Sequence, residues 1–246
     1  MDTQIYIVGH KPIDYGFWDN KLYTPIQVGF ADKFTELRDN TGDNIAEWND
    51  LFAELTAHYW IAHNVDNYKN IGVCQYRRRF EFPEDFDFNA ILKEHYAIAP
   101  RPLKLGCTVR QQYEACHCKR DLDEVEKIVK DIYPEYADAW DRIINSGNTL
   151  FYANSFIMKA EDFKEYVNWI TWIDFKWLRD WKGIDKPEDA YGIIRKDIAD
   201  GIRPSTRGEK YQVQLATFMA ERLLTFWYLK DNKPLYLVDY RKYENV

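Results

Sequence analysis

The segment IGVCQYRRRF (71–80) places the strongest constraint on how this chain can fold. Ile71–Cys74 are small or apolar, which is typical of a strand buried on both faces, and three arginines follow almost at once. A second run of this kind, QIYIVGH (4–10), also ends in polar residues. Strands that are apolar throughout occur mainly in parallel sheets covered by helices. We therefore predict an α/β protein with a mostly parallel central sheet and helices on both faces.

The rest of the chain alternates between strand and helix patterns. Asn44 and Glu47 resemble a capping box, and apolar residues at helical spacing continue from there to Asn64. Three further segments show helical patterns: 108–144, 161–181 and 211–232. Four further segments resemble strands: 25–29, 95–101, 149–160 and 234–240. Residues 182–210 are polar and contain Pro and Gly, so we expect a mobile segment there, within a single domain over 1–246.

Composition limits the function classes. The formal net charge of −7 argues against general nucleic-acid binding but permits a local basic pocket. Of the four cysteines (Cys74, Cys107, Cys116 and Cys118), the last two stand too close together for a zinc knuckle, so we expect free thiols in a reducing compartment. The sequence shows neither a signal segment nor an apolar run of about 18 residues. These features predict a cytoplasmic protein.

The arginines at the end of the predicted strand indicate an anion site. Ligands of open α/β sheets bind outside the carboxyl ends of the strands, where these arginines lie. In an extended chain Arg77 and Arg79 point one way and Arg78 the other, toward both sides of the crevice. A guanidinium group suits phosphate because its planar fork donates two parallel hydrogen bonds. The alternative is ion pairing with the acidic loop that follows, which carries Glu81, Glu84, Asp85 and Asp87.

The order of several motifs resembles a known family. The motifs are His10-Lys11, PIQVG (25–29), DNTGDNI (39–45), ELTAHYW (54–60), IGVCQYRRRF (71–80), QQY…H (111–117), PEY (134–136), NSFIMK (154–159) and ERLL (221–224). They are similar to those of the bacterial capsular and exopolysaccharide glycosyltransferases long catalogued as a domain of unknown function. The resemblance covers 5 to about 227. The motifs DNTGDNI, ELTAHYW and YRR carry most of its specificity.

The resemblance implies a GT-A-like, Rossmann-like fold and transfer of a sugar from a nucleotide donor. It implies a nucleotide-binding half over about 1–105 and an acceptor-side, mostly helical half over about 106–246. The expected donor is a UDP-linked hexose, with galactofuranose among the sugars known in the family. The expected acceptor is a lipid-linked oligosaccharide or polysaccharide, with peripheral contact at the inner membrane.

Two positions depart from the family pattern. The family usually reads His-Tyr-Arg-Arg-Tyr where this chain reads Gln75-Tyr76-Arg77-Arg78-Arg79, so an amide replaces the imidazole. The family also often carries an Arg about seven residues ahead of ERL, where this chain has none between Tyr211 and Gln214. Both changes keep open an alternative function, a non-catalytic protein that binds a nucleotide sugar or carbohydrate. A phosphate-ester hydrolase with the arginines as an anion clamp is a weaker alternative.

Glycosyl transfer requires neutralisation of the leaving diphosphate. We assign this role to Arg77 and Arg78 and expect no metal to be required. A Mg²⁺ or Mn²⁺ ion held by Asp85 and Asp87 is the weaker alternative. A second Asp-x-Asp match, at 121–123, lies on a predicted helix and is interpreted as a solvent-facing pair.

The remaining candidates fall into two groups. The predicted nucleotide- and sugar-binding residues are Val8, His10, Lys11, Asp39, Gly42, Asn44, Glu54, Thr56, Tyr76 and Asn154. A general base for the acceptor hydroxyl is expected among Asp43, His117 and Glu221. Two of these have structural alternatives: His117 as a hydrogen-bonded, half-buried side chain, and Glu221 as the partner of Arg222 in an ion pair.

Overall fold

The computed structural model describes residues 2–12, 21–30 and 32–242. Its centre is a six-stranded sheet of order β2-β1-β3-β8-β5-β9. The strands, in that order, are Tyr23–Gln27, Thr3–Gly9, Asn70–Gln75, Phe156–Lys159, Ala97–Pro100 and Leu235–Val238. β8 runs antiparallel to both of its neighbours, and the other neighbouring pairs are parallel. The predicted mostly parallel sheet is confirmed.

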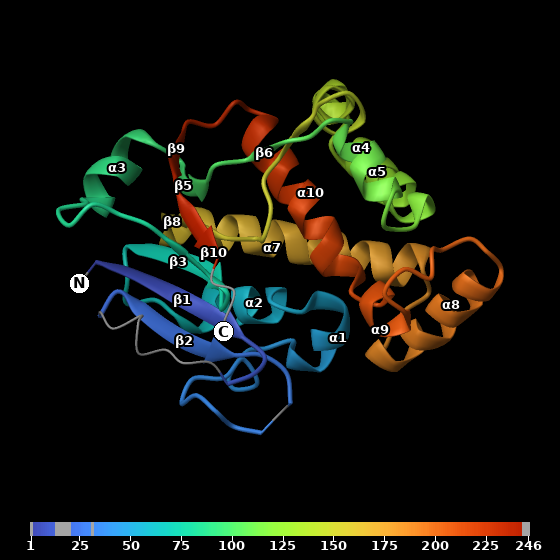
Figure 1. Ribbon diagram of the computed structural model, residues 1–246, viewed down its shortest axis with the longest axis horizontal. Helices are drawn as coiled ribbons and strands as arrows, with labels where there is room; N and C mark the ends of the chain where they lie inside the picture. The colour runs from blue at the N-terminus through green and yellow to red at the C-terminus, as the bar shows by residue number, and fades with distance from the viewer. Residues whose placement is uncertain (1, 13–20, 31, 243–246) are drawn as a thin grey trace.

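The two faces of the sheet are covered differently. On one face, side chains such as Tyr6 and Val73 pack against α2 (Leu55–Asn64), α7 (Ala160–Lys176) and α10 (Leu215–Leu229) in the larger core. On the other face, Ile5 and Ile157 pack beneath α3 (Phe88–Glu94) and a ribbon formed by β4 (Arg78–Phe80) and β10 (Tyr240–Lys242). Figure 1 shows α7 and α10 extending from the sheet toward the helical part of the chain.

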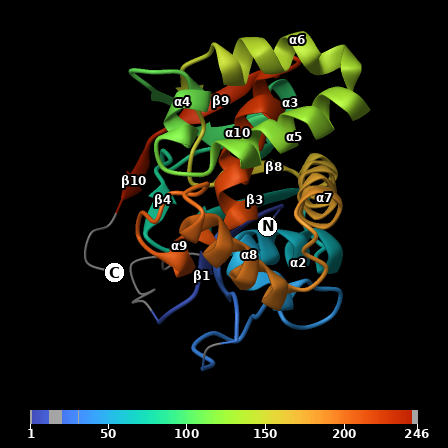
Figure 2. The ribbon, with the colours of Figure 1, turned by 90° about the vertical axis from the view of Figure 1, so that its right-hand side faces the viewer.

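The remaining helices form the outer layers. They are η2 (Ala46–Trp48), α1 (Asn49–Phe52), α4 (Val109–Glu114), α5 (Lys119–Ile132), η3 (Pro134–Tyr136), α6 (Ala137–Trp140), η4 (Asp141–Asn145), η5 (Trp177–Trp181), α8 (Pro187–Ala199) and α9 (Glu209–Gln212). A two-stranded ribbon of β6 (Leu103–Lys104) and β7 (Thr149–Leu150) lies beside them. Figure 2 shows α8 and α9 grouped together below α10. Across the described ranges, no helix combines the length and the apolar character that crossing a bilayer requires.

Two predicted elements are interrupted by strained backbone. The predicted helix over 44–64 breaks between α1 and α2 at Ala53, where φ is 43°. The predicted strand over 149–160 breaks between β7 and β8, because Ala153 and Asn154 have φ values of 66° and 43°. Residues other than glycine rarely adopt a positive φ, so local propensity predicted a continuous helix and a continuous strand. Both breaks lie next to the pocket described below.

The segment 182–210 was predicted to be mobile. It contains the helices α8 and α9. Polar residues at its ends form a buried ion cluster with α5. Lys182 and Arg203 approach the Asp121 carboxylate at 2.7 and 2.8 Å, and all three side chains are at most 2% exposed. Lys182 and Arg203, two of the polar residues of the segment, therefore serve in buried ion pairs.

Gly72 in β3 tests the packing at the centre of the sheet. A Cβ at Gly72 would lie 2.7 Å from Ile157 Cγ1 and 3.0 Å from Ile5 Cγ1. We therefore expect Gly72→Ala to lower the free energy of unfolding by about 1–3 kcal/mol through overpacking, measured by urea denaturation. Gly192→Ala is the matched control, because its Cβ meets nothing within 4 Å in α8 and Ala favours a helix by up to about 1 kcal/mol. Equal urea midpoints for Gly72→Ala and the parent protein would contradict this packing.

Candidate functional site

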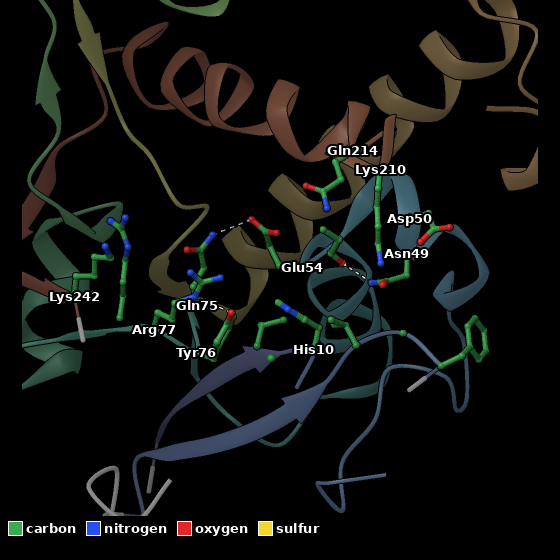
Figure 3. A pocket seen from close by; sticks show the side chains of 17 residues that line it. His10, Asn49, Asp50, Glu54, Gln75, Tyr76, Arg77, Lys210, Gln214 and Lys242 are labelled. Atoms are coloured by element: carbon green, nitrogen blue, oxygen red, sulfur yellow. Dashed lines mark hydrogen bonds between the residues drawn. The ribbon is translucent and has the colours of Figure 1, made fainter. Parts of the chain in front are cut away.

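A pocket of about 580 Å³ opens at the carboxyl edge of β1, β2 and β3. Parallel strands of open α/β sheets commonly bind ligands at this edge, because loops diverge there and leave a crevice. The residues that line it are Val8, Gly9, His10, Val28, Gly29, Phe30, Asn49, Asp50, Ala53, Glu54, Gln75, Tyr76, Arg77, Arg78, Lys210, Gln214 and Lys242. Figure 3 shows that they come from the sheet, from α1, from the α9 region and from β10.

Four long cationic side chains line this pocket. Arg77 and Arg78 follow β3, Lys210 comes from α9, and Lys242 comes from β10. Arg78 and Lys242 are directly opposed across the β4–β10 ribbon. Like charges placed opposite each other on neighbouring strands repel, so this pairing is unfavourable unless an anion lies between them.

The acidic loop after the arginines does not pair with Arg77 or Arg78. Arg77 Nε donates to the Tyr76 hydroxyl at 2.7 Å, and the Arg78 guanidinium lies 4.9 Å from the Tyr152 ring centroid. Glu81 instead pairs with Arg241 at 2.8 Å. Over the described ranges, the four cations form no ion pair with a carboxylate, so the alternative of pairing with this loop is wrong for Arg77 and Arg78.

His10 and Tyr76 form the floor between β1 and β3. Their rings meet edge to face with centroids 5.1 Å apart, and Lys11 Nζ lies 5.6 Å from the Tyr76 centroid. Partial burial, followed by the positive charges of Arg77, Lys11 and Lys210, lowers the pKa of His10. A neutral His10 can therefore donate one hydrogen bond and accept another at neutral pH.

The Glu54 carboxylate faces this cationic set from the start of α2. Its Oε1 accepts a hydrogen bond from Asn154 Nδ2 at 3.0 Å and another from Gln75 Nε2 at 3.3 Å. Burial raises the pKa of Glu54, and the charge of Glu221 adds to the effect, while the two amides oppose it. Figure 3 shows Glu54 between Gln75 and Lys210.

A buried hydrogen-bond chain supports the wall formed by α1. Thr56 Oγ1 donates to Asp39 Oδ2 at 2.5 Å and accepts from Asn49 Nδ2 at 3.2 Å. Asp39 and Thr56 are fully buried, whereas Asn49 lines the pocket. Asp39 and Thr56 therefore support the wall and do not line the pocket.

The match to a family model comes from the part of the chain that builds most of this site. Residues 4–186 match the model described as "Domain of unknown function (DUF4422)". The chain belongs to this DUF4422 family. The match contains the strands β1, β2 and β3 and the arginines, whereas Lys210, Gln214 and Lys242 lie beyond the matched residues. None of the curated proteins matches the chain.

A solved structure is similar over the full length of the DUF4422 chain. The structure of WbbM, a bifunctional glycosyltransferase in its apo form, superposes with a TM-score of 0.77 at 21% sequence identity. The alignment covers 100% of this chain but 46% of WbbM, so the chain spans less than half of the length of that protein. This similarity establishes the fold, which is GT-A-like, as the sequence resemblance implied.

The structure gathers some of the predicted binding residues and leaves others apart. Six predicted residues line the pocket: Val8, His10, Glu54, Tyr76, Arg77 and Arg78. Four more lie against that group or support it: Lys11, Asp39, Thr56 and Asn154. The other five belong to neither group: Gly42, Asp43, Asn44, His117 and Glu221.

The turn that contains Gly42, Asp43 and Asn44 packs against the far end of α2. Asn64 Oδ1 accepts from the Asp43 backbone N–H at 3.1 Å, and a Cβ on Gly42 would lie 2.1 Å from the same oxygen. The Asp43 carboxylate approaches His63 Nδ1 at 3.1 Å. Asn44 accepts from the Ala46 N–H at 3.2 Å and so caps the turn. These contacts hold the turn against α2, outside the pocket lining.

His117 and Glu221 contact the helical half. The His117 ring stacks on Phe218 with centroids 4.2 Å apart, and burial lowers its pKa to about 3. Glu221 accepts from the Ala153 N–H at 2.8 Å. It also pairs with Arg222 at 3.1 Å, which is the ion pair given above as the structural alternative for this residue. The Ala153 contact places Glu221 behind the turn that carries Asn154, outside the pocket lining.

Each Asp-x-Asp pair contains at least one carboxylate with a structural partner. Asp87 caps α3 by accepting from the Ala90 N–H at 3.0 Å, and neither Asp85 nor Asp87 lines the pocket. The interpretation of the pair at 121–123 as solvent-facing is wrong for Asp121, which is fully buried between Lys182 and Arg203. In the described part of the chain, no three His, Cys, Asp or Glu side chains gather in a way that could hold a metal ion.

The predicted alternation of the arginines is wrong. Arg77 and Arg78 both line the pocket, whereas Arg79 lines a separate aromatic hollow with Phe80 and Phe82. The alternation fails because the chain turns at Tyr76 and Arg77 between β3 and β4 and is not extended there.

Sequence reasoning missed Lys210, Lys242, Asn49, Asp50 and Gln214 as pocket residues. Lys210 lies in the segment predicted to be mobile, and Lys242 reaches the site only because β10 pairs with β4. Asn49 carried a local signal, since its spacing from Thr56 would place both residues on one face of the predicted continuous helix. The two lysines carried none, because long-range strand pairing and helix docking bring them to the pocket.

Asp39 gives a pH-dependent test of the buried chain. Burial raises its pKa from 3.8 to about 6, so the folded state binds this proton more tightly than the unfolded state does. The protonated Asp39 therefore stabilises the folded state. This contribution is fully present below pH 4 and is lost as pH rises through 6, and it corresponds to about 3 kcal/mol at 1.4 kcal/mol per pKa unit. We expect the parent to lose about this much unfolding free energy relative to Asp39→Asn between pH 4 and pH 7. Parallel pH profiles in urea denaturation would contradict the buried carboxyl.

Proposed function

We propose that this DUF4422 chain is a glycosyltransferase that takes its sugar from a nucleoside diphosphate donor. The observation that carries the proposal is a set of four cations around a pocket at the carboxyl edge of the sheet, none of which pairs with a carboxylate of the described residues. A diphosphate supplies the negative charge that relieves their repulsion. In the transition state it would gain further charge, which the same cations would stabilise. The GT-A-like fold is compatible with this activity.

The two ends of the pocket suit the two ends of such a donor. The side toward β1 and β2 carries Val8, Val28 and Phe30, and the Phe30 ring is 68% exposed. An exposed aromatic ring and apolar side chains favour a flat base. The opposite side carries Arg77, Arg78 and Lys242, so the donor would lie with its nucleoside toward β2 and its diphosphate toward the β4–β10 ribbon. A volume of about 580 Å³ lies within the usual range for small-molecule sites.

The finer identity of the substrates rests on the family resemblance. We propose a UDP-linked hexose, galactofuranose included, as donor and a lipid-linked capsular or exopolysaccharide chain as acceptor. The proposed setting is the cytoplasm, with peripheral contact at the inner membrane.

One observation favours a second candidate, a non-catalytic protein that binds a nucleotide sugar. Gln75 stands where the family usually has His, and its amide donates to Glu54, so position 75 offers no group that titrates near neutral pH. Turnover separates the candidates. The enzyme releases nucleoside diphosphate from the bound donor, whereas the binding protein does not.

Binding of UDP tests the cationic set. We expect UDP to raise the melting temperature of the parent protein, and we expect Arg77→Ala and Arg78→Ala each to weaken UDP binding about 10- to 100-fold. The reason is that a hydrogen bond to a charged group contributes about 1.5–3 kcal/mol. Calorimetric titration measures the dissociation constants directly.

Arg79→Ala is the matched control for the UDP titration. It removes the same charge from the neighbouring residue, whose side chain lines the other hollow, and it should leave the dissociation constant within about threefold. The proposal fails if UDP and a panel of nucleotide sugars do not bind, or if all three arginine variants weaken binding equally.

Metal dependence provides a separate test, because we propose that the four cations neutralise the diphosphate without a divalent ion. UDP affinity should stay within about threefold when EDTA replaces Mg²⁺ or Mn²⁺ in the titration. A loss of binding in EDTA that Mn²⁺ restores would show instead that the diphosphate binds through a metal.

A further inference from the structure

Two residues that position Glu54 have strained backbone conformations. Ala53, directly before it, has a φ of 43° and a ψ of −120°, which turns the chain between α1 and α2 and directs Glu54 into the pocket. Asn154, which donates to Glu54, also has a positive φ of 43°. Non-glycine residues in such conformations are unfavourable by about 1–3 kcal/mol each and cluster at functional sites.

Among the described residues, the side-chain hydrogen bonds to the Glu54 carboxylate reach one oxygen and leave the other to a ligand. Both amides, Asn154 Nδ2 and Gln75 Nε2, donate to Oε1. Asn154 is buried and itself approaches the Thr217 carbonyl, so its position is fixed by α10. Two donors on one oxygen hold the plane of the carboxylate while Oε2 can accept a hydrogen bond from a ligand hydroxyl.

The surroundings of Glu54 suit proton transfer. Burial and the nearby Glu221 carboxylate raise its pKa, which brings it closer to neutrality than an exposed glutamate. The other titratable groups of the pocket are His10, Asp50, Tyr76, Arg77, Arg78, Lys210 and Lys242. Asp50 differs from Glu54 because it is exposed and accepts from the Tyr191 hydroxyl at 3.0 Å, so its geometry ties it to α8.

We propose that Glu54 is the general base that activates the acceptor hydroxyl, an inference that rests on the proposed glycosyl transfer. The acceptor hydroxyl gives its proton to Glu54 Oε2 as its oxygen forms a bond to the anomeric carbon. The bond from that carbon to the diphosphate oxygen breaks, and its electron pair leaves with the nucleoside diphosphate. Arg77, Arg78, Lys210 and Lys242 stabilise the charge on the leaving group. The anomeric configuration is inverted.

The experiment compares binding and turnover of Glu54→Gln with those of the parent protein. A panel of UDP-sugars is used, with water as acceptor, and UDP release is measured. Glu54→Gln should bind UDP within about threefold of the parent and release it at least about 100-fold more slowly, since general base catalysis contributes about 10²–10⁴-fold. Glu54→Asp keeps a carboxylate one methylene shorter, so it should fall between them. It also provides the test if Glu54→Gln melts below the assay temperature.

Glu47→Gln is the matched control, since it neutralises an exposed carboxylate on η2, outside the pocket lining, and should keep turnover within about threefold. With methanol in place of water, the methyl glycoside should have the inverted configuration. Equal UDP release by Glu54→Gln and the parent, or a retained configuration, would overturn the role of Glu54 and leave the proposed function intact. A parent protein that binds UDP-sugars but releases no UDP would overturn glycosyl transfer itself.

Discussion

Burial of β3 on both faces is the constraint on which the site depends. The strand lies between β1 and β8, and Gly72 has no side chain because Ile5 and Ile157 occupy the space that a Cβ would need. Polar side chains of such a strand can reach solvent only at its ends. At the carboxyl end Gln75, Tyr76 and Arg77 meet the ends of β1 and β2, and the pocket forms there. The tight sheet and the polar pocket are thus two consequences of one packing arrangement.

The cationic side chains of the protein lie in two distinct kinds of environment. In the helical half, Arg110 pairs with Glu114 and Asp123, and Lys182 and Arg203 share Asp121 inside the core. Around the pocket, Arg78 and Lys242 face each other, and within the described residues neither forms an ion pair with a carboxylate. A chain with 40 acidic and 33 basic residues has enough carboxylates to pair its cations, so the lack of ion pairs at these two cations is a property of the site. Because exposed charges are screened within about 8–10 Å at physiological salt, ligand affinity at this pocket should depend on ionic strength.

The sequence was sufficient to predict the parts that local patterns determine. The apolar runs predicted β1 and β3, and the position of the arginines after β3 predicted a basic edge of the sheet. Helical spacing could not predict the break at Ala53, because alanine favours a continuous helix and the break depends on tertiary packing. Strand alternation likewise missed the turn at Asn154. These two errors fall at the residues that hold Glu54, which agrees with the view that strained backbone persists where a site requires it.

The most direct measurement of the central claim is a crystal structure of the protein with UDP bound. We expect both phosphates to lie within hydrogen-bond distance of the Arg77 and Arg78 guanidinium groups, with the uracil on the β2 side near Phe30. We also expect the β-phosphate to lie on the same side of the pocket as Glu54, where the sugar would be attached. A diphosphate bound elsewhere on the surface, with Arg77 and Arg78 turned onto neighbouring carboxylates, would show that these cations do not hold the donor.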